Sequence, residues 1–244
     1  MSPAQPTYAH AVPGDAIVLT KRYADALDFA RIIHAGDTRK GTAIPYLAHV
    51  LAVSALVLEG GGREDQAIAG LLHDAAEDHG GLATLKQIRS EFGPHVADLV
   101  EACSDSLTAD RNAKAPWWDR KVGYLRKLEA EPPEVALVSC ADKVHNARAI
   151  VSDYRDRGED LWTIFNRDAG RAGTLWYYQR LTAVLGARLA GSGQAAVALA
   201  AELTRIVDSL VSAVATNVGV DVMRADAEWA RQREAEVLVG LPAS

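Results

Sequence analysis

The chain has 244 residues, of which 49% are hydrophobic and 24% are charged, and these values are ordinary for a globular protein with one large domain. Its formal net charge of −6 argues against a general nucleic-acid or anionic-membrane binder, because the chain has no basic excess to displace counterions. The N-terminus shows no secretory signal, and no apolar run approaches the length of about 20 residues that a membrane-spanning helix needs.

Helical periodicity extends along nearly the whole chain, and no segment alternates as a strand does. Residues 1–14 carry three prolines and little apolar pattern, so they are predicted to form a flexible arm. Thr84 and Gln87 have the spacing of a helix-capping box, and residues 104–117 are expected to be a mobile loop. Helices are predicted over residues 21–34, 45–59, 64–78, from about 84, from 94, 118–130, 133–153, 168–190, 194–216 and 221–239.

These elements predict an all-α fold of about ten helices in a single domain over residues 15–190. The helices of residues 191–244 are expected to pack on the same domain or to form an interface between copies, so the protein is predicted to be a monomer or a homo-oligomer. The two cysteines, Cys103 and Cys140, lie in apolar helical surroundings, which is typical of buried thiols in a cytoplasmic protein.

The run from His73 to Asp78 places four ionisable groups on an otherwise apolar, small-residue helix. Because a helical residue advances by about 100°, His73 and Glu77 share one face, and Asp74 and Asp78 follow its neighbouring edge. Burying unpaired carboxylates is strongly unfavourable, so this cluster needs a compensating cation, and a divalent metal would supply it. The competing interpretation is a solvated acidic helix end with a chance histidine.

A second polar group follows the apolar run of residues 135–141. Asp142 ends that run, and His145 and Asn146 follow on the same helical face. An apolar helix that presents these groups on one side is expected to deliver them to an interior site. His49 also lies on the inward face of its predicted helix, but a lone histidine there is more often a hydrogen-bonded core residue than a ligand.

Taken together, these motifs resemble those of the HD-domain alarmone hydrolases. This family comprises the hydrolase half of the Rel/SpoT enzymes and the free-standing small alarmone hydrolases, including the metazoan Mesh1 type. The resemblance covers roughly residues 21–180. Its motifs occur in the family's order, as Arg39-Lys40 with Pro45-Tyr46 and His49, then Leu71 to Asp74 with Glu77-Asp78, then Ala141 to Asn146.

The resemblance implies a metal site, a catalytic pair and a substrate site. The metal, manganese in this family, would be held by His49, His73, Asp74 and Asp142, a mixed imidazole and carboxylate set that suits Mn²⁺. The catalytic acidic pair would be Glu77 and Asp78. The substrate, a small-molecule nucleotide, would be bound by Arg39 stacked on the base, by Lys40 and Lys143 at the phosphates, and by Asn146 and Tyr178. The implied reaction is hydrolysis of the 3′-diphosphate of (p)ppGpp, and the chain leaves no room for the family's synthetase domain.

The sequence departs from the long Rel/SpoT enzymes at two places. Residues 41–44 are Gly-Thr-Ala-Ile where those enzymes have a Ser-Gly-Glu type segment, and Ala149 stands where a threonine is usual. Because of these two changes, another substrate, such as ppApp, a 3′-phosphorylated cofactor or a modified RNA end, is a competing hypothesis to (p)ppGpp. A non-catalytic nucleotide-binding module is a third hypothesis, disfavoured because every expected ligand and both acidic residues are present. Arg120-Lys121 and Arg126-Lys127 are expected to be solvated helix faces.

Overall fold

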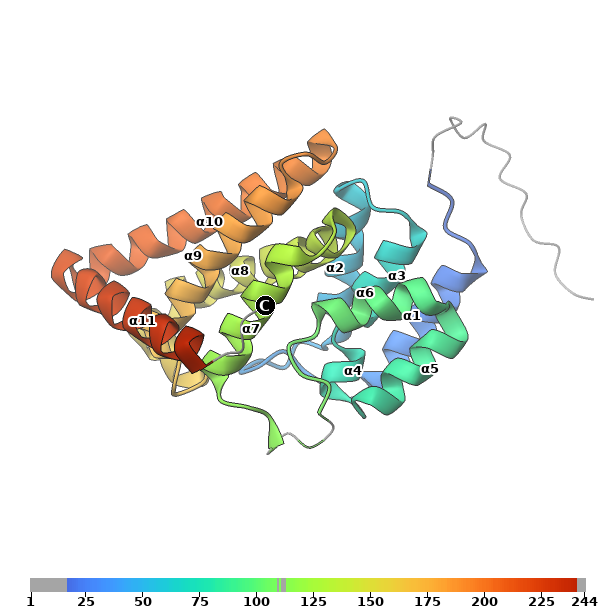
Figure 1. Ribbon diagram of the computed structural model, residues 1–244, viewed down its shortest axis with the longest axis horizontal. Coiled ribbons are helices and arrows are strands. Elements are labelled where there is room, and N and C mark those ends of the chain that lie inside the picture. The colour runs from blue at the N-terminus through green and yellow to red at the C-terminus, as the bar shows by residue number, and fades with distance from the viewer. Residues whose placement is uncertain (1–16, 109, 111–112, 241–244) are drawn as a thin grey trace, which may run out of the picture.

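Figure 1 shows the computed structural model, which describes residues 17–108, 110 and 113–240. Within these ranges the chain forms helices and no β-strand, so the all-α prediction is confirmed. The arm predicted for residues 1–14 lies outside the described residues. The α-helices are α1 (Lys21–Ile33), α2 (Leu47–Glu59), α3 (Glu64–Leu72), α4 (Ala75–Asp78), α5 (Leu82–Phe92), α6 (Pro94–Cys103), α7 (Trp117–Ala130), α8 (Pro133–Arg157), α9 (Gly170–Leu189), α10 (Gln194–Val218) and α11 (Val220–Gly240).

Helix α8 lies at the centre of the bundle. It packs against α2, α3 and α6 on one side and against α9 and α10 on the other (Figure 1). Its first half is apolar and almost completely buried, from Val135 to Ala141. Because both halves of the bundle exclude water from this stretch, α8 carries the next polar residue, Asp142, into the interior. Gly158 ends α8 with a φ of 58° and opens a 3₁₀ helix, η2 (Gly158–Ile164), which the sequence did not predict.

The continuous helix predicted over residues 64–78 is wrong. The chain leaves helical hydrogen bonding at His73 and Asp74, and only the single turn α4 follows. The two polar residues therefore lie at a junction between helices, from which their side chains turn towards the interior. The capping box predicted at Thr84 is also wrong, since α5 begins two residues earlier and Gly81, at its N-cap, has a φ of 59° that favours glycine.

Helices α2 and α3 approach each other closely at Gly70. A β-carbon at this position would lie 3.1 Å from the Cα of Ser54 and 3.2 Å from its backbone nitrogen. The Ser54 hydroxyl donates to the carbonyl of Ala67 at 2.8 Å, so a polar contact holds the two helices at this separation. The close approach places the α3–α4 junction directly beside α2, which carries His49.

The C-terminal helices pack on the rest of the bundle. Helix α10 contacts α8 and α9, and α11 contacts α9 and α7 (Figure 1). Arg171 of α9 pairs with Asp226 of α11 at 2.6 Å, and the Trp176 indole donates to Glu234 at 2.9 Å. None of the described helices is long and apolar enough to cross a membrane.

Candidate metal centre

Two imidazoles and two carboxylates from three parts of the chain meet beside α8. Nε2 of His49 lies 3.6 Å from Oδ2 of Asp74 and 3.3 Å from Oδ1 of Asp142. Nε2 of His73 lies 3.0 Å from the same oxygen of Asp74 and 3.6 Å from that of Asp142. Each nitrogen therefore faces both carboxylates, and this is the set of four residues that the sequence predicted as metal ligands.

The two Nε2 atoms are buried and have no hydrogen-bond partner. His73 donates its Nδ1 hydrogen to the Gly70 carbonyl at 2.9 Å, so Nε2 is the nitrogen that faces the carboxylates. His49 contacts Nδ1 of His145 through its own Nδ1 at 2.8 Å, an arrangement in which one ring must donate to the other. In metal sites a histidine ligand usually binds the ion through one ring nitrogen while a neighbour holds the other. His49 and His73 have this arrangement, so both are suited to bind a divalent cation through Nε2.

The charges of this cluster support the same conclusion. Burial would raise the pKa of Asp142, but Lys143, His49 and His73 hold it well below its usual range. Burial would lower the pKa of His73, but Asp74 and Asp142 raise it well above the ordinary value. Without a metal the two carboxylates, of which Asp142 is buried and Asp74 partly exposed, therefore keep a proton on His73, and a divalent cation can replace that proton.

Three neighbours orient the carboxylates. The Tyr46 hydroxyl donates to Oδ2 of Asp74. Lys143 pairs with Oδ2 of Asp142 at 2.5 Å, and the Asn146 amide donates to Oδ1 of Asp142 at 2.5 Å. Lys143 and Asn146, which are predicted to contact substrate, both also contact Asp142. Tyr46 was part of the motif but received no role, because a tyrosine at a helix start gives no signal of where its hydroxyl points.

A polar cavity of about 230 Å³ opens next to the four clustered residues. Glu77 and Asp78 both line it, as the predicted catalytic pair requires. Glu77 accepts from Lys114 at 3.0 Å and from the backbone N–H of Asp105 at 3.2 Å. Burial, together with the charges of Asp105 and Asp74, raises the pKa of Glu77 to about 7. The other residues that line the polar cavity are Tyr46, Asp74, Cys103, Asp105, Lys121, Tyr124, Asp142, Lys143, Asn146 and Tyr177.

The prediction that Arg120 and Lys121 form a solvated helix face is wrong. Lys121 lines the polar cavity, where its ammonium pairs with Asp105 at 2.6 Å and lies 5.0 Å from the ring centre of Tyr177. Arg120 pairs with the same carboxylate at 2.6 Å. The missed signal was Asp105, which stands in a polar loop, so its partners were not visible from the sequence.

A second cavity, of about 310 Å³, adjoins the first through Asn146, which lines both. Arg39, Lys40 and Tyr178 line this second cavity, and Arg39 donates to the Asn146 side chain at 3.0 Å. All five residues predicted to bind substrate therefore line one of two adjoining cavities. The second cavity is completed by Thr42, Ile44, Ala149, Ile150, Asp153, Ile164 and Phe165.

An all-helical bundle that gathers two histidines and two aspartates beside a polar cavity defines a class of helical metal-binding domains. The chain belongs to the HD domain family, whose model matches residues 26–175.

Several curated proteins are similar to it. The mouse guanosine-3′,5′-bis(diphosphate) 3′-pyrophosphohydrolase MESH1 is 32% identical over 127 residues, which are 51% of this chain and 66% of the mouse protein. A Synechocystis protein described as a probable enzyme of the same name is 32% identical over 125 residues, again 51% of this chain but 16% of that protein. The chain therefore spans less than a fifth of this long relative.

Two solved structures share the fold. The structure reported as a metazoan ortholog of SpoT that hydrolyzes ppGpp superposes with a TM-score of 0.59 at 22% identity, and covers 78% of this chain and 97% of the other. The crystal structure of lmo0812 from Listeria monocytogenes gives a TM-score of 0.53 at 26% identity, and covers 66% of this chain and 97% of the other. Both superpositions support the all-α assignment.

Proposed function

We propose that this protein is a Mn²⁺-dependent (p)ppGpp 3′-pyrophosphohydrolase. The observation that carries the proposal is the convergence of His49, His73, Asp74 and Asp142 beside a cavity that also contains Glu77 and Asp78. The similarity to pyrophosphohydrolases of mouse, Synechocystis and Aquifex aeolicus supports it. In the proposed reaction water cleaves the ester to the 3′ oxygen, and the products are pyrophosphate and GDP or GTP.

The metal ligands are proposed to be His49, His73, Asp74 and Asp142. Two imidazoles and two carboxylates, with positions left for water, suit octahedral Mn²⁺ better than structural zinc. A divalent ion held there supplies positive charge that polarises a phosphoryl oxygen and makes water more acidic. Tyr46, Asn146 and His145 keep the ligands in place through the hydrogen bonds described above.

Glu77 and Asp78 are proposed to move the protons. A carboxyl group with a pKa of about 7 is half ionised at neutral pH, so Glu77 can accept a proton from the attacking water. Lys114 and the N–H of Asp105 fix its orientation. Asp78, which lines the same cavity, is proposed to assist the charge balance or the departure of the leaving oxygen.

The substrate is proposed to span both cavities. Arg39 and Tyr178 offer flat surfaces for a base in the larger cavity, where Ile164 and Phe165 add apolar walls. Lys143 lines the polar cavity and Lys40 the rim of the other, so cations face a diphosphate from two directions. We further infer that residues 191–244 belong to the same domain as residues 15–190, since α10 and α11 pack on α7, α8 and α9.

The second candidate function is the same chemistry on another 3′-phosphorylated nucleotide, such as ppApp. Thr42, Ile44 and Ala149, which replace the usual family residues, all line the larger cavity. They therefore lie where the base or the ribose would be recognised.

One assay tests both candidates. Purified protein is incubated with Mn²⁺ and a panel of ppGpp, pppGpp, ppApp and 3′-phosphorylated cofactors, and the products are separated by chromatography. The expected result is release of pyrophosphate from ppGpp and pppGpp, and a preference for ppApp would favour the second candidate.

Glu77→Gln should lower turnover by about 10²–10⁴-fold while Mn²⁺ binding is retained. The matched control is Glu91→Gln, an exposed carboxyl on α5, and equal turnover in the two variants would contradict the assigned base.

A further inference from the structure

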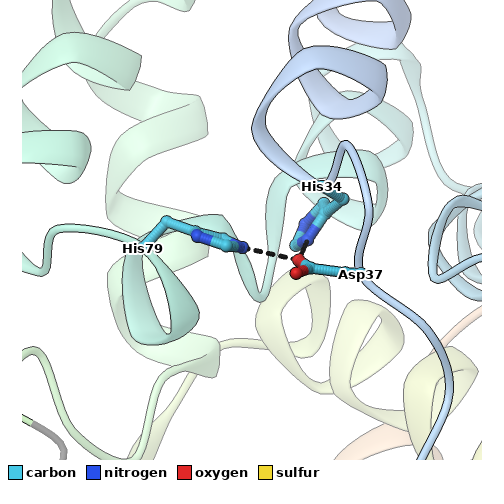
Figure 2. A group of neighbouring side chains, drawn as sticks. All are labelled: His34, Asp37 and His79. Atoms are coloured by element: carbon cyan, nitrogen blue, oxygen red, sulfur yellow. Dashed lines mark hydrogen bonds and ion pairs between the residues drawn. The ribbon is translucent and has the colours of Figure 1, made fainter.

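Three further side chains converge at the ends of two helices, beside Tyr46, whose ring contacts both His34 and His49. His34 follows α1, Asp37 lies in the turn after it, and His79 follows α4. Nδ1 of His34 lies 3.0 Å and Nε2 of His79 lies 2.6 Å from the same oxygen, Oδ2 of Asp37. Figure 2 shows both imidazoles directed at this carboxylate from different segments of the chain.

We propose that His34, Asp37 and His79 form a second metal site, which takes a divalent transition-metal ion of the Zn²⁺ type. One ligand atom from each residue lies within 4.8 Å of the other two. Two imidazoles and one carboxylate form a set of three protein ligands that zinc accepts, with water in the fourth position. Tetrahedral bonds of about 2.0–2.1 Å place neighbouring ligand atoms about 3.3 Å apart. The two separations here are those of hydrogen bonds, 3.0 Å and 2.6 Å, so an ion would need to widen them by only a few tenths of an ångström.

The electrostatics of the cluster favour a cation. In the part of the chain that the structure describes, the ion pairs of Asp37 are both with imidazoles. No lysine or arginine among the described residues pairs with this carboxylate, so a metal ion could balance its charge. The cluster also lies at the carboxyl end of the 13-residue helix α1, where the helix dipole favours positive charge.

The exposure of the three side chains leaves room for the fourth ligand. The His34 side chain is fully buried, whereas those of Asp37 and His79 are 36% and 30% exposed. Water can therefore reach the ion from one side. The buried ring of His34 packs on Tyr46, with ring centres 4.9 Å apart, so its orientation is fixed by the fold.

An ion at this second site would stabilise the segment that connects it to the first. The backbone carbonyl of Asp37 accepts from the N–H of Tyr46 at 2.9 Å, and the Tyr46 hydroxyl donates to Asp74. The segment between Asp37 and Tyr46 carries Arg39 and Lys40. Binding is therefore expected to hold residues 37–46 against the end of α4, a structural role that is separate from the proposed hydrolysis.

The test is the stoichiometry of Zn²⁺ binding to the full, metal-stripped chain, measured by calorimetry with Zn²⁺ alone. The wild-type protein should bind two ions and His79→Gln one, with affinity at the second site reduced by more than about 100-fold, because even outer partners of metal ligands contribute 10–100-fold. His73→Ala should retain the second ion and lose the first, and the double variant should bind none. The matched control, His95→Gln, removes a half-exposed surface histidine and should still bind two.

Two results would overturn the second site. The first is a wild-type protein that binds one ion, which is lost in His73→Ala. The second is a His79→Gln protein that still binds two ions, since the additional ion would then lie elsewhere. Asp37→Asn provides an independent variant if circular dichroism shows that His79→Gln is unfolded. Neither of these two results would contradict the proposed hydrolase activity, because the assay measures metal binding and contains no nucleotide.

Discussion

His73 and the carboxylates beside it share a charge balance that depends on pH. In the metal-free protein Asp74 and Asp142 raise the pKa of His73 well above its ordinary value, so the ring is protonated near neutrality. This contribution to stability is complete below the unfolded-state pKa and is lost as the pH rises through the folded-state pKa. A cation at the same position must displace that proton.

We therefore predict that Mn²⁺ affinity rises with pH. One proton released per ion gives about a tenfold gain per pH unit until the folded-state pKa of His73 is passed. The measurement is Mn²⁺ titration followed by electron paramagnetic resonance between about pH 6 and pH 8, in the His79→Gln protein so that only the central site reports. Affinity that is independent of pH across this range would contradict the assigned protonation of His73.

At the residue scale the sequence could single out His73, Asp74 and Asp142, because each interrupts an apolar run with a group that is costly to bury alone. His49 was predicted as a ligand only through the family resemblance. The sequence could not identify the roles of Tyr46 and Lys121, and it placed His145 at an interior site without its partner His49, because all three act through partners far away in the chain. Their roles depend on how three helices are placed relative to one another. That placement is a tertiary property, and no local pattern encodes it.

At the scale of single helices, the contact between α2 and α3 is a second point that can be tested. Gly70→Ala should lower the free energy of unfolding, because the new β-carbon would press on the Ser54 backbone. Overpacking of this kind costs about 1–3 kcal/mol, whereas replacing glycine by alanine in a helix gains at most about 1 kcal/mol. We expect a net loss of about 0.5–2 kcal/mol on these two scales, measured by urea denaturation.

Gly186→Ala is the matched control for this change. Gly186 lies within α9 and has no atom within 4 Å of the position of a β-carbon. The substitution should therefore raise the free energy of unfolding by roughly 0.5–1 kcal/mol. If Gly70→Ala were equally stabilising, the close approach of α2 and α3 would not be rigid.

The helix boundaries also show where sequence reasoning fails. The bounds of α1, α2, α6 and α7 follow from glycine, proline and apolar spacing, and they lie within about two residues of those predicted. The break at residues 73 and 74 has no such marker, because histidine and aspartate between alanine and leucine are compatible with a helix. Tertiary packing that turns both side chains inwards outweighs local propensity there.

On the scale of the whole molecule, α11 should be dispensable for the metal site. It packs on α7 and α9, whereas the four clustered residues lie on α2, α8 and the α3–α4 junction. Deleting residues 219–244 should lower Tm by several degrees, because Trp176 loses Glu234 and Arg171 loses Asp226. Tryptophan fluorescence should shift to the red while Mn²⁺ stoichiometry is retained. Loss of Mn²⁺ binding would show that α11 supports the site.

The central position of α8 limits where the protein can change. Residues 135–141 form core for both halves of the bundle, so a mutation there must satisfy two packing partners at once. Thr42, Ile44 and Ala149 border the larger cavity without such a double constraint. Directed evolution towards a new nucleotide substrate should therefore accumulate substitutions at these three positions. Residues 135–141 of α8 should tolerate very few substitutions.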